Sequence, residues 1–210
     1  MSQIIDITYF QKANELNLPL AVVSLVANPT LATPNNTEAL TLLCEKVEKS
    51  ILTGALGLSV YNTLQLALAD INNPLYASYK NLVQGEEYGT KKWPGLDNDY
   101  SLIAYRIFEQ FLFQTNEALT GVGTVHGKPE KATFVSPKYK IANANSNFIK
   151  QYQHGFYYNP VIDGIFIDYY GNQEGIEVSL YQYLNDKRAD FTALKMDLFR
   201  IYETINSFGI

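Results

Sequence analysis

The stretch DNDYSLIAYRIFEQFLFQTNEAL, residues 97–119, decides the fold that we predict for this chain. Its apolar side chains recur at the spacing of about 3.6 residues that is typical of an α-helix. They cover so much of the helix circumference that we expect this helix to be buried on several sides. The sequence therefore predicts a central helix here, with Asp97 and Asp99 supplying a cap and a favourable charge at its start.

Further helical periods lie on both sides of this central segment. The other expected helices, each with an apolar stripe, cover residues 37–54, 59–71, 75–83, 138–153 and 186–207. Gly54 and Gly57 end the first of these helices, and Ser59 can cap the second. We therefore predict a mainly α protein built as a helical bundle of connector type, with an extended N-terminal arm and a β-hairpin before the last helix.

The chain is expected to divide into four parts. These are an extended arm over 1–36, a helical core over 37–155 with loops at 85–95 and 120–137, a β-hairpin extension over 156–185, and a C-terminal helix over 186–210 that packs on the core. The arm is interrupted by three prolines, and its apolar stretch over 20–26 is suited equally to packing on another subunit or on its own domain. Both alternatives stay open.

Composition limits the classes of protein to which the chain can belong. Of its 210 residues 47% are hydrophobic, which is enough to bury a core. The net charge of −5 argues against a tight grip on nucleic acid. We expect no membrane span and no secretion signal, because no apolar run approaches about 20 residues. Cys44 is the single cysteine and lies in an apolar stripe, so we expect it to be buried and unreactive.

Catalytic motifs are not found in the sequence. Of the two histidines, His126 lies in the long loop and His154 at an expected helix end, and neither has a nucleophile at a useful spacing. Three carboxylates near the expected hairpin could hold a hard cation: Asp163, Asp168 and Glu174. We take this metal site as a minor alternative, and expect a protein that is not an enzyme and that binds no metal or cofactor.

Aromatic and β-branched side chains gather in the arm, the long loop and the hairpin. Since aromatic residues are enriched at protein interfaces, we expect these residues to contact other subunits, with a domain core and, after it, a ligand platform as the alternatives. The predicted interface residues are Leu20, Val22, Val23, Val125, Phe134, Val135, Phe156, Tyr157, Tyr158, Phe166, Tyr169, Tyr170 and Tyr181.

Four short sequences, read in order, resemble a known family. They are GLSVYNTLQ (57–65), YKNLVQGEEY (79–88), WPGL (93–96) and ATFVSP (132–137). Their succession over about residues 37–155 resembles the head–tail connector, or adaptor, proteins of tailed bacteriophages, and most of all the neck ring proteins of crAss-like phages of Bacteroides. The proline-broken arm and the hairpin over 165–183 depart from that pattern.

The resemblance implies a structural virion protein located in the phage neck and assembled in the host cytoplasm. Its expected partners are copies of itself in a ring of about twelve, the portal protein, and other neck or tail proteins. DNA would pass through the ring as cargo, and no membrane would be involved. The alternative function is a ligand- or carbohydrate-binding module that uses the tyrosine-rich hairpin.

Overall fold

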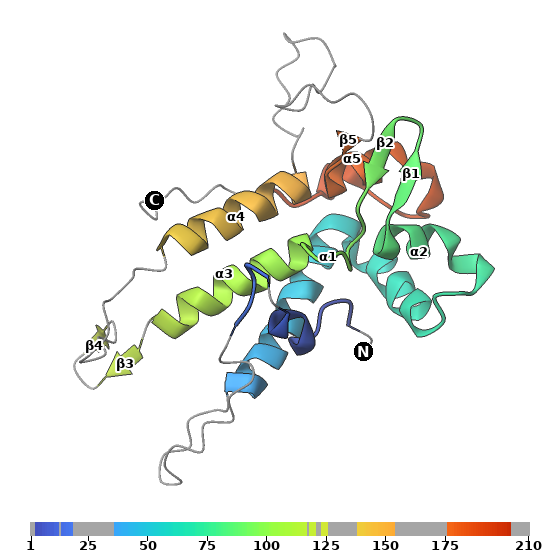
Figure 1. The fold of residues 1–210 in the computed structure, drawn as a ribbon. Coiled ribbons are helices and arrows are strands. Elements are labelled where there is room, and N and C mark those ends of the chain that lie inside the picture. Colours follow the sequence, from blue (N-terminus) through green and yellow to red (C-terminus); the bar gives the residue numbers. More distant parts are fainter. Residues whose placement is uncertain are drawn as a thin grey trace.

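The computed structural model describes residues 3–12, 14–18, 36–116, 118–120, 123–125, 138–153 and 176–202. Within them the protein is mainly helical, as predicted. The centre is a pair of antiparallel helices that lie side by side, α3 (Leu102–Asn116) and α4 (Lys138–Gln153) (Figure 1). The apolar pattern on both helices accounts for this pairing, since each needs a partner to cover its apolar side.

Helix α1 (Asn36–Ala69) is broken where the sequence predicts a break. Gly57 has φ of 75° and ψ of 161°, values that lie outside the helical region and are open to glycine. We call residues 36–56 the first arm of α1 and residues 58–69 its second arm. The apolar stripes expected on the two arms are buried, with Leu40, Cys44, Leu52 and Leu64 fully covered.

The N-terminal residues differ from the extended arm expected over 1–36. Residues 7–11 form the 3₁₀ helix η1 (Ile7–Gln11), which begins at the side chain of Asp6. The N-terminal segment, residues 3–12 and 14–18, is part of the core rather than an arm. Its buried apolar side chains are Ile5, Tyr9, Phe10, Leu16 and Leu18. Residues 19–35 lie outside the described part of the chain.

A short helix and a hairpin follow α1. The 3₁₀ helix η3 (Pro74–Tyr76) leads into α2 (Ala77–Gln84), where a helix over 75–83 was expected. Leu75 is 84% exposed rather than buried with Tyr79, because it lies in η3 and not on the apolar side of α2.

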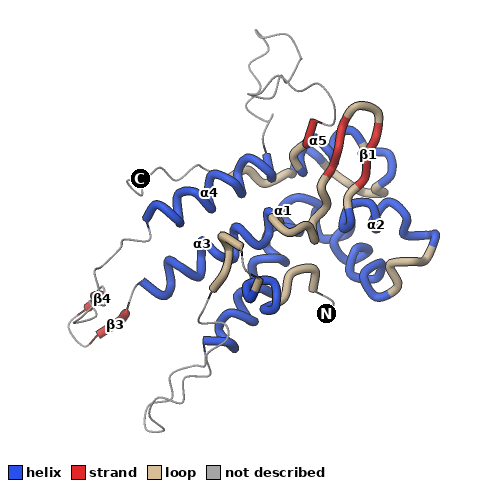
Figure 2. The backbone as a smooth tube through the Cα atoms, in the orientation of Figure 1, coloured by secondary structure: helices blue, strands red, loops and turns tan. Residues whose placement is uncertain are grey.

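Strands β1 (Glu86–Tyr88) and β2 (Lys91–Trp93) form a hairpin within residues 85–95, where a loop was expected. Strand β5 (Ile176–Glu177) pairs in parallel with β2 to complete a three-stranded sheet. Figure 2 shows this sheet at the opposite end of the helices from the second hairpin, β3–β4.

The central helix is shorter than expected at both ends. It begins at Leu102 rather than near residue 97, because Ser101 is its cap: the Ser101 Oγ accepts a hydrogen bond from the backbone N–H of Ile103. It ends at Asn116, and the next residues form β3 (Ala118–Thr120) and β4 (Gly123–Val125), an antiparallel pair. The loop expected over 120–137 therefore contains strand residues at its start.

The C-terminal part differs most from the sequence expectation. A strand was expected over 176–183 and a helix over 186–207, but β5 ends at Glu177 and is followed by α5 (Leu180–Asp186). Ser179 caps α5 by accepting a hydrogen bond from the N–H of Gln182. Beyond α5, the described residues form only the 3₁₀ turns η4 (Arg188–Asp190) and η5 (Met196–Leu198).

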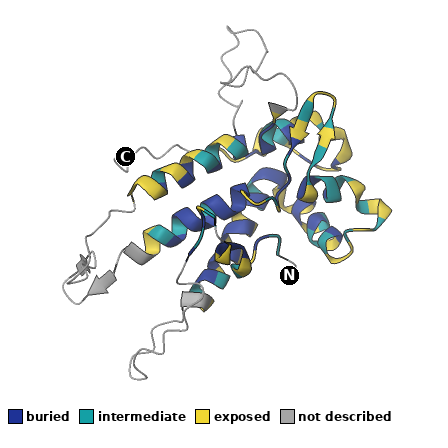
Figure 3. Ribbon diagram, in the orientation of Figure 1, coloured by how far each residue is buried: buried dark blue, intermediate teal, exposed yellow. Residues whose placement is uncertain are grey.

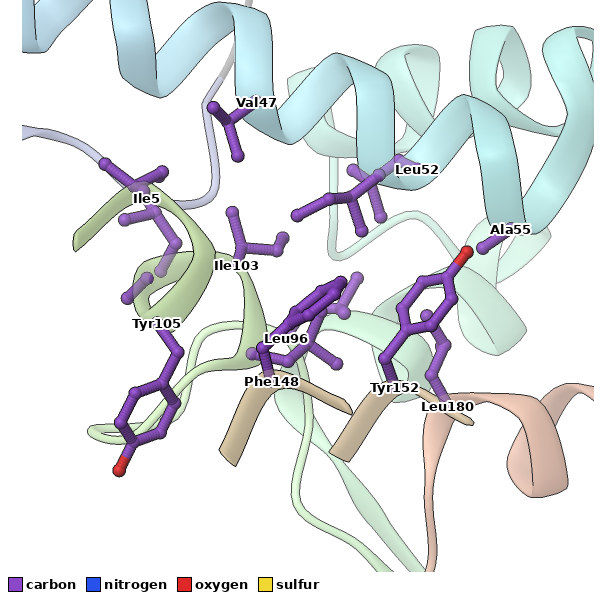
Figure 4. Packing of buried hydrophobic residues seen from close by; sticks show 14 of the residues in the cluster. Ile5, Val47, Leu52, Ala55, Leu96, Ile103, Tyr105, Phe148, Tyr152 and Leu180 are labelled. Carbon is purple, nitrogen blue, oxygen red and sulfur yellow. The ribbon is translucent and has the colours of Figure 1, made fainter. Parts of the chain in front are cut away.

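The core lies where the helices face one another, as the dark blue sides of α1, α3 and α4 show in Figure 3. Figure 4 shows Phe148 and Tyr152 of α4 packed against this cluster, with the Tyr152 hydroxyl directed toward Ala55 of α1. Asn145 of α4 is polar but fully buried, because α3 covers that side of the helix. At the other end, the fully buried Trp93 stacks on Tyr183 of α5 with 5.1 Å between ring centroids.

Among the described residues, one helix, over Glu38–Ala69, is long and apolar enough to cross a membrane by length and composition. The sequence predicted no span because no apolar run approaches about 20 residues, whereas this helix passes the test of length and composition. It is weak evidence of a span, since core helices pass the same test, and 44% of the most apolar window is buried in this fold.

Candidate interaction surface

The structure places only a small part of the interface expected from the sequence. Tyr181 is half-buried in α5 and packs edge to face on Phe199 of its own chain, with 5.1 Å between ring centroids. Val125 lies in β4. The predicted interface residues outside the described part are Leu20, Val22, Val23, Phe134, Val135, Phe156, Tyr157, Tyr158, Phe166, Tyr169 and Tyr170.

The candidate catalytic and metal-binding residues near the long loop and the expected hairpin fall outside the described part of the chain. His126, His154 and the three hairpin carboxylates Asp163, Asp168 and Glu174 lie outside the described residues. Within the described ranges no three histidine, cysteine or acidic side chains gather in a way that could hold a metal ion.

The remaining candidates are described and have structural roles. Cys44 is fully buried, as predicted, and burial raises the pKa of its thiol to about 12. Neither Asp97 nor Asp99 caps α3. The Asp99 carboxylate instead accepts a 2.8 Å bond from the Lys12 ammonium at the surface.

An uncharged face lies on the second arm of α1. The twenty residues 50–69 carry no charged side chain. Three residues four apart along this arm, Leu58, Asn62 and Leu66, lie on one side of the helix and are exposed; both leucines are 63% exposed. We call these three residues the leucine face. No charged side chain lies between the two leucines, and Asp70 follows one turn beyond Leu66. Exposed apolar side chains that gather on one face are a feature of surfaces that bind other proteins.

The sequence contains a signal for this face that the apolar stripe alone does not reveal. The buried apolar residues of the second arm are Val60, Tyr61, Leu64 and Ala67, and Leu58 and Leu66 lie on the opposite side of the same helix. A helix that is apolar on both sides has one side to pack in its own fold and one side left over.

A cleft opens between the N-terminal segment and the two central helices. It has a volume of about 460 Å³. Its floor is apolar and its rim polar, and the residues that line it are Asn14, Glu15, Leu16, Asn17, Tyr105, Phe108, Tyr139, Lys140, Asn143 and Ala144. This size lies within the range of about 300–1,000 Å³ that is usual for ligand sites.

Both ends of the rim carry hydrogen-bonding groups. On one wall the Tyr105 hydroxyl donates to Glu15 Oε1. Burial raises the pKa of the phenol, and the Glu15 carboxylate raises it further. On the other wall, Lys140 and Asn143 are exposed on α4, and neither side chain forms an ion pair or hydrogen bond with the described residues. The cleft therefore offers one cation and one free amide above an apolar floor.

Two buried carboxylates elsewhere hold the fold together. Glu48 of α1 is 3% exposed, and its Oε2 accepts hydrogen bonds from the N–H groups of Ile4 (3.0 Å) and Ile5 (3.1 Å). Burial raises the pKa of Glu48 to about 7, against the opposing effect of these two bonds. The carboxylate thus fixes the start of the N-terminal segment to α1.

Glu109 on α3 is the second buried carboxylate. It accepts a 2.7 Å bond from Arg106 and a 3.3 Å bond from the buried amide of Asn145 on α4. Burial raises its pKa, and the Arg106 charge opposes this. The Arg106 guanidinium also lies 5.2 Å from the ring centroid of Phe148 and 5.2 Å from that of Tyr202. This network joins α3 to α4, and its polar groups bind one another.

Comparisons with protein-family models, with curated proteins and with solved structures find no match to this chain.

Proposed function

We propose that this chain is a structural subunit of a tailed-phage neck, which assembles with its own copies into a ring between portal and tail and continues the DNA channel. The observation that carries the proposal is the leucine face, because it is a surface of the described fold suited to contact with a second copy. The order of short sequences that resembles the connector proteins supports the same assignment.

The size of the apolar contribution agrees with an assembly role. Burying a leucine side chain contributes about 1.5–3 kcal/mol, so Leu58 and Leu66 together would stabilise each contact by several kcal/mol. A face on one subunit that meets a different face on the next generates a ring when the rotation closes. The leucine face is proposed as one half of that contact.

The overall charge supports passage of DNA rather than binding. Each chain has a net charge of −5, so a ring of about twelve copies would carry roughly 60 negative charges. Repulsion from the phosphate backbone opposes tight adhesion to DNA inside a channel. A neck component needs this property, since DNA must slide through its channel without sticking.

The proposal assigns no catalytic role to the chain. The buried carboxylates Glu48 and Glu109 are bonded to backbone amides or to Arg106 and Asn145, so their acceptor positions serve the fold. A general acid or base needs a position within reach of a reactant.

Introducing charge on the leucine face tests the proposal. Wild-type chain should sediment as a ring-sized assembly or join one when mixed with the portal protein of the same phage. The double variant Leu58→Glu/Leu66→Glu should remain a monomer in analytical ultracentrifugation, because burying two carboxylates in an apolar contact is strongly unfavourable. Its circular dichroism should match the wild type, since both positions are exposed.

Leu42→Glu is the matched control. Leu42 is 65% exposed and lies on the first arm of the same helix, outside the leucine face. This variant should assemble like the wild type. A wild-type chain that stays monomeric with and without portal protein would contradict the proposal, and so would equal assembly of the double variant and the control.

A further inference from the structure

The last described residues of the chain lie across the first arm of α1 and the end of α4. We call residues 196–202 the strap; they begin with η5, which contacts α1, and continue without regular secondary structure. The backbone N–H of Arg200 donates a 2.8 Å bond to the carbonyl of Gly54. This carbonyl lies in the last turn of the first arm, where carbonyl groups lack a partner in their own helix.

The end of the strap is bound through its main chain. The fully buried side chain of Gln153 accepts a 2.8 Å bond from the N–H of Tyr202 and donates a 2.7 Å bond to the carbonyl of the same residue. One side-chain amide therefore satisfies both backbone groups of one residue. Main-chain hydrogen bonds of this kind are how folded proteins bind peptide segments.

Two aromatic side chains of the strap fit among aromatic rings of the helices. Phe199 is 6% exposed, and its ring centroid lies 4.7 Å from that of Tyr152 and 5.1 Å from that of Tyr181. Tyr202 packs edge to face on Phe148 and on Tyr152, with 5.1 Å between centroids in each pair. The site thus selects a segment with two aromatic residues three positions apart.

Gly54 lets the strap approach the helix closely. A Cβ at this position would lie 3.1 Å from the Cβ of Arg200 and 3.2 Å from its Cδ, closer than side chains normally pack. Glycine inside a helix is otherwise unfavourable. The contact with the strap accounts for it here.

The connection that leads to the strap is strained. Ala193 has φ of 71°, and among the described residues it alone has a positive φ without being a glycine. This conformation brings the Cβ too close to the backbone. Ala193 lies in the turn in which the N–H of Leu194 donates a 3.1 Å bond to the carbonyl of Phe191. Short connections under strain favour the exchange of a terminal segment between copies, because the strain is released when the turn opens.

We propose that in the assembled protein the strap of one copy occupies the site on α1 and α4 of an adjoining copy. Both straps have the same sequence, so the exchange keeps every contact of the strap with its site and opens only the strained turn. Such an exchange links subunits at little cost. The inference deepens the proposed self-assembly and rests on it.

Disulfide trapping tests the exchange. One chain carries Gly54→Cys, a second chain with a different affinity tag carries Arg200→Cys, and the two are co-expressed and oxidised. A Cβ at position 54 lies 3.1 Å from that of residue 200, within a few tenths of an ångström of the roughly 3.5–4.5 Å that a disulfide needs. The native Cys44 does not interfere, since it is fully buried with a pKa of about 12.

Leu42→Cys replaces Gly54→Cys in the matched control. Leu42 is exposed on the same arm but lies about 18 Å along the helix from position 54. Roughly tenfold more linked heterodimer is expected for the first pair, because docking raises the effective concentration of the two thiols. Equal yields would overturn the inference. So would a chain carrying both cysteines of the first pair that links only within itself.

Ala193→Gly tests the role of the strain. Glycine adopts a positive φ without a clash, so this variant removes the reason for the turn to open, and the yield of heterodimer should fall roughly fivefold. Thr192→Gly, at the exposed neighbouring position, is the control and should leave the yield unchanged. Equal yields from the two variants would contradict the exchange as argued.

Sedimentation of the same preparations separates the two proposals. Assembly without preferential trapping would contradict only the exchange of the strap. A chain that never assembles would contradict the proposed function as well.

Discussion

Glu48 is the residue at which charge and folding are most directly coupled. Its carboxylate is buried between the first arm of α1 and the N-terminal segment, where one oxygen accepts from two backbone N–H groups. Desolvation raises its pKa from 4.5 to about 7. Because the folded pKa is the higher one, the native state binds the proton more tightly than the unfolded chain does.

This shift predicts that stability falls as pH rises. The stabilising contribution of protonated Glu48 is fully present below pH 4.5 and is lost as pH rises through about 7. The free energy of unfolding should therefore decrease by on the order of 3 kcal/mol across this window from this group alone. Urea unfolding at a series of pH values measures it.

Glu48→Gln and Glu48→Ala separate the charge from the hydrogen bonds. The glutamine keeps one acceptor oxygen and removes the titration, so this variant should lose the slope between pH 4.5 and 7 and be more stable than wild type at pH 8. The alanine leaves the amides of Ile4 and Ile5 without their acceptor, at a cost of about 1–3 kcal/mol at every pH. An unchanged slope in Glu48→Gln would contradict the assignment.

At the scale of elements, the β1–β2 hairpin depends on two glycines that meet at its base. A Cβ at Gly85 would lie 2.6 Å from the carbonyl oxygen of Trp93, and one at Gly95 would lie 2.6 Å from that of Val83. Both have positive φ, 89° and 91°. The close approach lets the backbone N–H of Leu96 donate to Val83, which joins the end of α2 to the chain leading into α3.

Gly95→Ala should therefore destabilise the protein by about 3 kcal/mol or more, because it adds a steric clash with backbone to the strain of a positive φ. Gly89→Ala is the matched control. Gly89 lies in the same hairpin with φ of 57°, but a Cβ there meets nothing within 4 Å, so only about 1 kcal/mol of strain is expected. Thermal unfolding of both variants gives the comparison, and equal losses would contradict the steric argument.

The elements that the sequence predicts well are those whose own apolar pattern decides them. The break in α1 follows from Gly57, and α4 has the expected bounds because its inward residues repeat at helical spacing. The prediction for the region after Glu177 was wrong for a different reason. Its β-branched and aromatic composition favours a strand, but the Ser179 cap and the contacts of Tyr183 with Trp93 stabilise a helix.

The candidate sites were harder to predict than the helices. The helical periodicity of the sequence alone predicts Glu48 on the solvated side of α1. It misses the burial of Glu48 because the N-terminal segment that covers this residue comes from more than forty residues away in sequence. The cleft has the same origin, since its walls are residues 14–17, α3 and α4. The leucine face, in contrast, is local, and the uncharged run over residues 50–69 would have indicated it.

At the scale of the whole molecule, the N-terminal segment adds a second connection between α1 and α3, which also pack on each other directly. Besides the bonds to Glu48, the Tyr9 hydroxyl donates to the carbonyl of Asn98 (2.8 Å) and accepts from the N–H of Ser101 (3.0 Å) at the start of α3. Phe10 is fully buried beneath these contacts. The segment thus closes the core from one side and also supplies a wall of the cleft.

A chain that lacks residues 1–18 should consequently fail to fold cooperatively. The five apolar side chains lost, Ile5, Tyr9, Phe10, Leu16 and Leu18, contribute about 1.5–3 kcal/mol each, or roughly 10 kcal/mol together. That is comparable to the whole stability of about 5–15 kcal/mol that is usual for a domain. Circular dichroism during heating should show no sharp transition for the truncated chain.

Phe10→Ala and Thr8→Ala give a graded version of the same test in the intact chain. The first replaces a fully buried ring and should lower the free energy of unfolding by about 3–5 kcal/mol. The second replaces an exposed side chain of the same 3₁₀ helix and should change it by less than about 1 kcal/mol. If truncation and Phe10→Ala both left the transition unchanged, the N-terminal segment would be an arm after all, and the core would close between α1, α3 and α4 without it.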